Sequence, residues 1–136
     1  MTNNSDSGHD DLTVVEAIYA AMATSDLSTL FDLLDPTIVV VQDDRLPWGG
    51  RHVGHDGFAT FGLTLRGNIA SSVATDAMFS ADGDVIQMGH TRGTVVATGE
   101  TFDIAEVHRW TIRDGRAIAA HFSIDTPAML NALATS

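Results

Sequence analysis

The stretch Thr101–Asp125, TFDIAEVHRWTIRDGRAIAAHFSID, predicts two β-strands joined by a turn at Asp114-Gly115. Alternate side chains of a strand point to opposite faces of the sheet. One face of the first strand therefore combines apolar side chains with two ionisable ones, and its members are Phe102, Ile104, Glu106, His108, Trp110 and Ile112. Because ionisable groups are rare on an apolar face, this hairpin is the centre of both the predicted fold and the predicted site.

The turn decides which residues of the second strand lie beside that face, since a shift of one residue reverses every side chain. A two-residue type I′ loop would bring in His121, Ser123 and Asp125. A three-residue loop, with Gly115 in the left-handed conformation and a bulge, would bring in Ala120, Phe122 and Ile124 instead. The second register separates apolar from polar side chains better, so we predict it.

The composition of the 136 residues limits the classes of partner. Eighteen acidic residues face seven arginines and no lysine, which gives a formal charge of −11. Nucleic acids and anionic membranes both favour basic surfaces, so we expect neither, and the charge favours a small molecule or a protein as the partner. The absence of cysteine excludes disulfides and thiolate catalysis. The N-terminal segment lacks the pattern of a signal peptide, and we expect a cytoplasmic protein.

Hydrophobic periodicity predicts the remaining elements. Residues 1–10 are polar and are expected to form a disordered tail, followed by a single domain over residues 11–136. Thr13 and Glu16 resemble a capping box at the start of the first helix. Further helices are predicted over 27–34, 58–65 and 127–133, strands over 38–41, 73–79 and 85–96, and a loop over 46–57. The order α-α-β-α-β-β-β-β indicates an α+β fold.

Three segments together resemble the NTF2-like superfamily, in its SnoaL-like, ketosteroid-isomerase-related branch. They are YAAMATSDLSTLFDLLDPTIVV from Tyr19, LPWGGRHVGHDGFATF from Leu46 and HRWTIRDGRAIAAHFSIDTPAML from His108. The resemblance implies a cone, in which a curved antiparallel sheet wraps around the N-terminal helices and encloses an apolar cavity. It also implies a homodimer. The superfamily includes isomerases, dehydratases, cyclases and noncatalytic binding modules, so the fold does not choose the function.

The resemblance to ketosteroid isomerases can be tested residue by residue. His108 matches the position of a pocket hydrogen-bond donor on the penultimate strand. Tyr19 is one residue away from the position of a second donor, which Ile18 occupies. The position of the catalytic base matches Gln42, which cannot accept a proton, and Asp43 is its neighbour. The match to the isomerase site is therefore partial.

Glu106 and His108 are two residues apart on one strand and share a face. Burial would raise the pKa of the glutamate and lower that of the histidine, which suits acid–base catalysis. We therefore expect His108 to be the main acid–base or oxyanion group, assisted by Glu106, with Tyr19 and Asp43 as auxiliary groups. The residues expected to line the substrate cavity are Trp48, Trp110, Phe122, His90 and Gln42.

These residues lead to two hypotheses. The first is a cofactor-independent acid–base enzyme of the isomerase, cyclase or dehydratase type, acting on an apolar small molecule in a buried pocket. The second is a noncatalytic ligand-binding or dimerisation module, which the glutamine at the base position favours. No phosphate loop or dinucleotide fingerprint occurs, and His52, His55 and Asp56 lack a second cluster of ligands, so we expect neither a cofactor nor a metal.

Overall fold

The computed structural model describes residues 4–134, and side chains from residue 10 onward. Within these residues the helices are α1 (Asn4–Ala23), α2 (Leu27–Leu33), α3 (Gly54–Asn68) and α4 (Thr126–Ala134). The strands are β1 (Leu34–Gln42), β2 (Gly50–Val53), β3 (Ile69–Ala81), β4 (Asp84–Val95), β5 (Thr101–Arg113) and β6 (Arg116–Ile124). No helix among the described residues is long and apolar enough to cross a membrane.

The six strands form one sheet in the order β2-β1-β6-β5-β4-β3, and the α+β class predicted from the sequence is confirmed. The sheet is mixed, however, and not purely antiparallel as expected, because β1 runs parallel to β6. Most of the chain separates these two strands, so no tight turn forces them to run in opposite directions. This parallel pair places the end of β1 beside the end of β6, where Gln42 pairs with Phe122.

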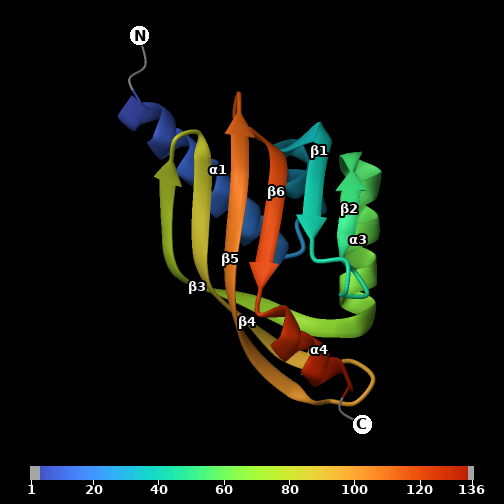
Figure 1. Cartoon of the computed structure of the whole chain (residues 1–136). Coiled ribbons are helices and arrows are strands. Elements are labelled where there is room, and N and C mark those ends of the chain that lie inside the picture. The colour runs from blue at the N-terminus through green and yellow to red at the C-terminus, as the bar shows by residue number, and fades with distance from the viewer. Residues whose placement is uncertain (1–3, 135–136) are drawn as a thin grey trace.

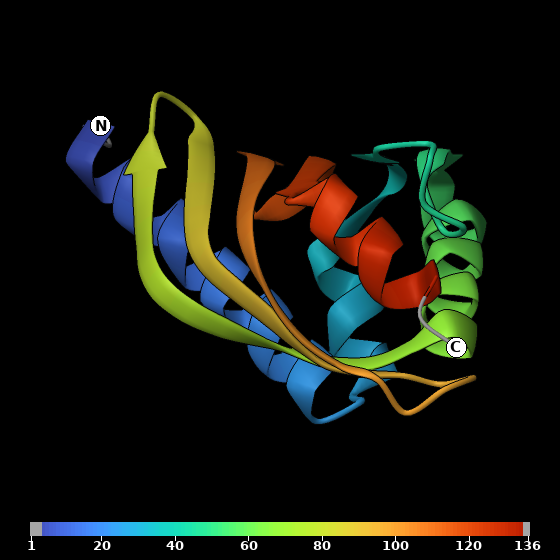
Figure 2. The same ribbon diagram turned by 60° about the horizontal axis from the view of Figure 1, so that its bottom comes forward.

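The sheet bends strongly, with α1 crossing the long strands β3 and β4 and with α3 lying along the short strands β1 and β2 (Figures 1 and 2). Asp76 is a bulge in β3, where the register with β4 shifts between Thr75 and Ala77. Gly89 of β4 lies opposite Thr75, and a Cβ atom at Gly89 would collide with the backbone oxygen of Ala74. A bulge and a glycine at the same level allow the two strands to approach and bend there.

The closing hairpin has the predicted register at the site. Glu106 pairs with Ile124, His108 with Phe122 and Trp110 with Ala120. The bulge lies elsewhere than predicted, because Arg113 pairs with Arg116 across a two-residue turn and the register shifts only between Thr111 and Ile112. Asp114 and Gly115 both have positive φ, at 53° and 77°, as a type I′ turn requires. The extra residue on β6 is Ile118, which no strand partner opposes.

Two segments depart from the sequence expectation. The first helix begins at Asn4 in the structure, where the sequence predicts a tail through Asp10. Residues 1–3 of the expected tail lie outside the described part. The loop expected over 46–57 contains the edge strand β2, which pairs with residues 39–42 of β1, and α3 begins at Gly54 with a φ of 77°.

The core lies between the helices and one face of the sheet, which we call the inner face. All six residues predicted on the apolar face of β5 are buried in this core. Helix α1 contributes Val15 and Ile18, both with no exposed surface. The opposite, outer face carries exposed residues of the same strands, among them Met88 and Val107. The alternation of the hairpin therefore separates the core from the surface as expected.

Candidate functional site

A row of side chains crosses the inner face at the level of His108. Its members come from four neighbouring strands and pair in sequence: Gln42 of β1, Phe122 of β6, His108 of β5 and Gln87 of β4. Glu106 and Trp110 lie on either side of His108 along β5, and all three are buried. The ring centroids of His108 and Phe122 are 4.5 Å apart. Polar groups are therefore concentrated within an otherwise apolar layer.

Helix α1 adds Tyr19 to this row, and the hydrogen bonds of its hydroxyl group show which nitrogen of His108 carries the proton. The indole Nε1 of Trp110 donates to the hydroxyl oxygen of Tyr19 over 2.9 Å. The same hydroxyl lies 2.6 Å from Nδ1 of His108. Because indole N–H can only donate, the tyrosine oxygen accepts there and its own proton goes to Nδ1. A neutral His108 therefore carries its proton on Nε2.

The Nε2 atom of His108 faces Glu106, whose Oε2 lies 3.3 Å away. The side chain of Glu106 is 1% exposed. Neither carboxyl oxygen has a hydrogen-bond partner of good geometry among the described residues. A buried carboxyl without such partners is costly, because desolvation removes its bonds to water. Glu106 is therefore a group in this row with unused hydrogen-bonding capacity.

Burial shifts the pKa values of all three groups in the direction of their neutral forms. It raises the pKa of Glu106 to about 7, against smaller opposing effects of Gln87 and His90. It lowers the pKa of His108 to about 3, and it raises the pKa of Tyr19 well above the usual range, with the Trp110 hydrogen bond opposing. At neutral pH, His108 and Tyr19 are neutral, while Glu106 is divided between its two forms.

Gln87 is a member of the row that sequence reasoning missed. Its side chain has no exposed surface, and its Nε2 donates to Oγ1 of Thr75 over 3.0 Å. Its Oε1 atom has no partner among the described residues. The alternation of β4 contained a signal for it, since Gln87 is in phase with Val85 and Thr91, which are also buried. Its buried amide lies across the strand from His108 and next to Glu106.

Gln42 and Trp48 form a structural pair. The indole Nε1 of Trp48 donates to Oε1 of Gln42 over 3.0 Å, and the two side chains are buried together. Trp48, predicted to shape the cavity from a loop, lies in the loop between β1 and β2 with its side chain buried in the core and 1% of its surface exposed. Trp110 is also fully buried, with its ring centroid 5.3 Å from that of Phe122. These aromatic side chains fill the inner layer.

Asp43 and His90, both predicted for the site, are not part of the buried row. Asp43 is on the surface, where hydrogen bonds from Arg45, and to a smaller extent their ion pair (2.7 Å), lower its pKa to about 2. His90 was expected to face the cavity but lies on the outer face of β4, with Nδ1 2.6 Å from Oδ1 of Asp103. The error has a physical cause, since β4 also carries the apolar Ile86 and Met88 on its outer face.

The two loop histidines have structural partners. Nε2 of His52 lies 3.1 Å from the backbone oxygens of Trp48 and Gly49, and Nε2 of His55 lies 2.8 Å from that of Leu34. Each ring therefore ties the chain before or within α3 to a neighbouring segment. Across the described residues, no group of three or more histidine and acidic side chains has an arrangement that could hold a metal ion.

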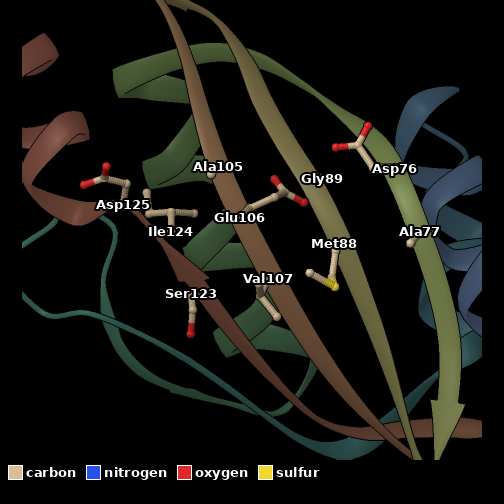
Figure 3. Close-up of a pocket in the computed structure, with 10 residues that line it drawn as sticks. All are labelled: Asp76, Ala77, Met88, Gly89, Ala105, Glu106, Val107, Ser123, Ile124 and Asp125. Carbon is tan, nitrogen blue, oxygen red and sulfur yellow. The ribbon is translucent and has the colours of Figure 1, made fainter.

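Two hollows lie next to the row. The larger, of about 460 Å³, is bordered by residues of β3 to β6, and Figure 3 shows its lining: Asp76, Ala77, Met88, Gly89, Ala105, Glu106, Val107, Ser123, Ile124 and Asp125. The smaller, of about 280 Å³, is lined by residues that include Gln42, Asp43 and Phe122. Neither lining includes His108, Tyr19 or Trp110. Glu106 is the member of the buried row that also borders the larger hollow, but both of its carboxyl oxygens are shielded from solvent.

Comparison with known proteins agrees with this architecture. The model of the SnoaL-like domain family matches residues 15–121 of the chain. This range begins in α1, before Tyr19, and ends in β6, so it contains the whole buried row except Phe122. No curated protein matches the sequence.

Several solved structures share the fold. An NTF2-like protein of unknown function from Burkholderia pseudomallei is 24% identical with a TM-score of 0.85, over 93% of this chain and 98% of that one. TerC, crystallised with polyporic acid, is 22% identical with a TM-score of 0.85, over 93% and 99%. A candidate SnoaL-like polyketide cyclase from Jannaschia is 14% identical with a TM-score of 0.85, over 100% and 99%. At these identities the likeness establishes the fold alone.

Proposed function

Because the chain belongs to the SnoaL-like domain family, we propose that it is an acid–base enzyme that needs no cofactor. Its reaction would be of the isomerase, cyclase or dehydratase type, and its substrate an apolar small molecule. The fold of this family is compatible with these activities and with simple ligand binding. The choice between them depends on the side chains of the buried row.

The observation that carries the proposal is the state of Glu106. Its carboxyl group is buried, has a pKa of about 7 and lacks a hydrogen-bond partner of good geometry. A general acid or base works best when its pKa lies near the working pH. A group whose oxygens are not engaged by the protein is also free to bind an atom of a substrate. Glu106 meets both requirements, whereas Asp43 meets neither.

We assign the proton transfer to Glu106 and the stabilisation of negative charge to His108. The ionised carboxylate takes a proton from a carbon next to a substrate carbonyl, and the electron pair moves to the carbonyl oxygen. The Nε2–H of neutral His108 donates a hydrogen bond to that oxygen. Glu106 then returns the proton to another atom of the substrate, which completes an isomerisation.

Tyr19 and Trp110 support this assignment as positioning residues. Trp110 donates to the hydroxyl of Tyr19, and that hydroxyl in turn donates to Nδ1 of His108. The pair thereby keeps the proton of His108 on Nε2, the atom that faces Glu106. The proposal keeps the oxyanion role, one of the two expected for His108, and assigns the proton transfer to Glu106. The low pKa of His108 is the reason, because a histidine that stays neutral does not supply a proton readily.

The proposal can be tested by measuring proton exchange. A panel of apolar cyclic ketones is incubated with the protein in D₂O, and deuterium incorporation next to the carbonyl is followed by NMR. The expected result is exchange with the wild-type protein and a loss of about 100-fold or more with Glu106→Gln. A matched control is Glu100→Gln, on the exposed turn before β5. Equal exchange by wild type and Glu106→Gln on a compound that reacts would overturn the assignment.

A noncatalytic binding module is the second candidate, and the packing of the inner layer favours it. Phe122 packs against the ring of His108 and Trp110 packs against Phe122, and neither hollow is lined by His108. The same NMR panel separates the two functions. Compounds that bind without exchanging deuterium would support the binding module and contradict the enzyme.

Two further expectations remain predictions. A homodimer is supported by apolar side chains exposed on the strands, among them Val73, Phe79, Met88 and Val107. The molar mass in solution, measured by light scattering, tests it, and a mass of one chain at all concentrations would contradict it. The cytoplasmic location expected from the sequence is tested by cell fractionation.

A further inference from the structure

Gln87 of β4 is a buried group that the proposed mechanism does not use. Its side chain has no exposed surface, and burying an amide is costly unless its polar atoms form hydrogen bonds. Its Nε2 donates to Oγ1 of Thr75 over 3.0 Å, while its Oε1 has no partner among the described residues. Because the amide nitrogen carries two hydrogens, one of them is available to another acceptor.

The strand register brings this amide toward Glu106. Gln87 pairs with His108, and the next residue on the same face of β4, Gly89, pairs with Glu106. A Cβ atom at Gly89 would lie 3.0 Å from Nε2 of Gln87, so the amide nitrogen lies beside the glycine. Figure 3 shows the side chain of Glu106 extending from β5 toward Gly89. The amide and the carboxyl group therefore approach the same place from neighbouring strands.

Glu106 is the acceptor that fits the free hydrogen of this amide. Neither of its oxygens has a hydrogen-bond partner of good geometry within the described part of the chain. Gln87 nevertheless acts on it as a donor, since it opposes the rise that burial causes in the pKa of Glu106. An ionised carboxylate attracts N–H donors more strongly than a neutral carboxyl group and forms shorter bonds with them. The contact therefore strengthens when Glu106 loses its proton.

Thr75 holds the amide from the other side. It lies on the edge strand β3 opposite Gly89, the same residue that Glu106 faces from β5. Its hydroxyl oxygen accepts from Nε2 of Gln87. The threonine, the glutamine and the glutamate therefore meet around one glycine from three adjacent strands, and the bond to Thr75 limits the movement of the amide.

From this geometry we infer that Gln87 is a positioning residue for Glu106. Its amide nitrogen donates to one oxygen of the ionised carboxylate, which stabilises the basic form of Glu106 and leaves the other oxygen for the substrate. The inference rests on the proposed function only where it assigns this base to proton transfer.

Other ionisable groups also surround Glu106, and the variants that test the inference keep all of them. They are His108 on β5, Tyr19 on α1, His90 on β4, and Asp76 and Asp125, which line the hollow that Glu106 borders. Helix α4, which contacts β5, carries no ionisable side chain. A change in the titration of Glu106 in these variants is therefore assigned to the amide.

The test measures the proton affinity of Glu106 directly by NMR. The chain has three glutamates, Glu16, Glu100 and Glu106, so ¹³C labelling of their side-chain carboxyl groups gives three signals. Glu106→Gln removes one signal and thereby identifies it. The acid dissociation constant of Glu106 is then obtained from the pH dependence of its chemical shift, and the other two glutamates serve as internal references.

Gln87→Met keeps the length of the side chain and removes the amide. The acid dissociation constant of Glu106 should fall about tenfold, because the carboxylate loses a donor. Thr75→Val, at an exposed position, keeps the shape of the side chain and releases the amide, and we expect a fall of about threefold. On a ketone that exchanges deuterium, the pH of half-maximal exchange should rise by the matching amount.

The matched control is Gln42→Met. Gln42 is the other buried glutamine of the row, but its Oε1 accepts from Nε1 of Trp48. Its removal also leaves a buried group without its partner, so the control reproduces the general cost of losing a buried amide. Gln42→Met should lower the urea midpoint of the protein and leave the dissociation constant of Glu106 unchanged.

An unchanged dissociation constant in folded Gln87→Met would overturn the inference, as would an equal fall in Gln42→Met. If Gln87→Met does not fold, Thr75→Val decides, and an unchanged constant there overturns the inference in the same way. The proposed function fails separately. A lowered constant without deuterium exchange on any ketone contradicts only the enzyme, and exchange with unchanged constants contradicts only the role of Gln87.

Discussion

Two histidine–carboxylate pairs lie on opposite faces of the sheet, one within β5 and the other between β4 and β5. On the inner face, His108 and Glu106 approach within 3.3 Å, with side chains that are 10% and 1% exposed. On the outer face, His90 and Asp103 approach within 2.6 Å, with side chains that are 35% and 53% exposed. The residue types are similar, but the pKa of Glu106 is raised to about 7 whereas that of Asp103 is lowered.

The difference shows that burial, more than the presence of a histidine, determines the chemistry of each carboxyl. Asp103 accepts hydrogen bonds from His90 and Arg92 while it stays in contact with water, so its ionised form is favoured. Glu106 has neither water nor a well-placed donor, so its neutral form is favoured. The outer pair stabilises the surface of the sheet, and the inner pair is suited to proton transfer.

The largest difference between the inner and outer pairs is expected in the effect of substitutions on activity. On a ketone that exchanges deuterium, His108→Ala should lower the rate about 100–1,000-fold, because it removes the donor to the developing oxyanion. His90→Ala should leave the rate unchanged, since that ring lies on the outer face. Circular dichroism and urea unfolding of both variants check that the fold is retained. A folded His108→Ala protein with the wild-type rate would remove the functional distinction between the pairs.

The second prediction concerns the dependence of stability on pH. Burial raises the pKa of Glu106 from 4.5 to about 7, so the folded protein binds this proton more tightly than the unfolded chain. The resulting stabilisation is complete below pH 4.5 and is lost as the pH rises through about 7. Its size is on the order of 3 kcal/mol of unfolding free energy.

Urea unfolding of wild type and Glu106→Gln across this pH range measures that loss. As the pH rises, the unfolding free energy of wild type should fall relative to that of Glu106→Gln. His108 contributes the opposite slope to both proteins, because its lowered pKa gives a stability that is lost as the pH falls below 6.5. A difference that is independent of pH would show that Glu106 titrates normally, as an exposed carboxyl does.

The third prediction concerns the hydroxyl that the inner pair depends on. Tyr19→Phe leaves two buried nitrogens, Nε1 of Trp110 and Nδ1 of His108, without their partner. The expected cost is about 1–3 kcal/mol of unfolding free energy. The rate of deuterium exchange should also fall, since the proton of His108 is no longer held on Nε2. A variant with wild-type stability and rate would mean that the hydroxyl neither supports the core nor fixes the tautomer.

The inner pair was predictable from the sequence because it depends on alternation along one strand. Phe102 to Ile112 alternate without interruption, and the apolar match to Phe122 selected the correct register at His108. The position of the bulge was not predictable, since Ile118 can leave the ladder without changing any pairing at the site. The outer position of His90 was missed because apolar neighbours on the exposed face of β4 imitate a core pattern.

The contact of Tyr19 with His108 required the structure. The sequence placed Tyr19 one residue from the expected donor position, and only the packing of α1 on the sheet determines which residue reaches His108. The unpartnered oxygens of Glu106 and Gln87 are likewise a property of packing. Sequence patterns identify which side chains share a face, but the distances between elements that are far apart in the chain depend on the whole core.

The smallest effect is expected at the outer pair. The lowered pKa of Asp103 gives a stability that is present at neutral pH and is lost as the pH falls through the acid range, opposite in sign to Glu106. Asp103→Asn should therefore reduce the sensitivity of the protein to acid and change its urea midpoint at neutral pH only slightly, because water and salt screen exposed pairs. Added salt should remove the remaining difference in urea midpoint between Asp103→Asn and wild type. It should leave the effect of Glu106→Gln on the midpoint unchanged, because burial and not a screened ion pair shifts the pKa of Glu106. If salt altered both differences equally, the two carboxyls would share one environment and the contrast between the faces would fail.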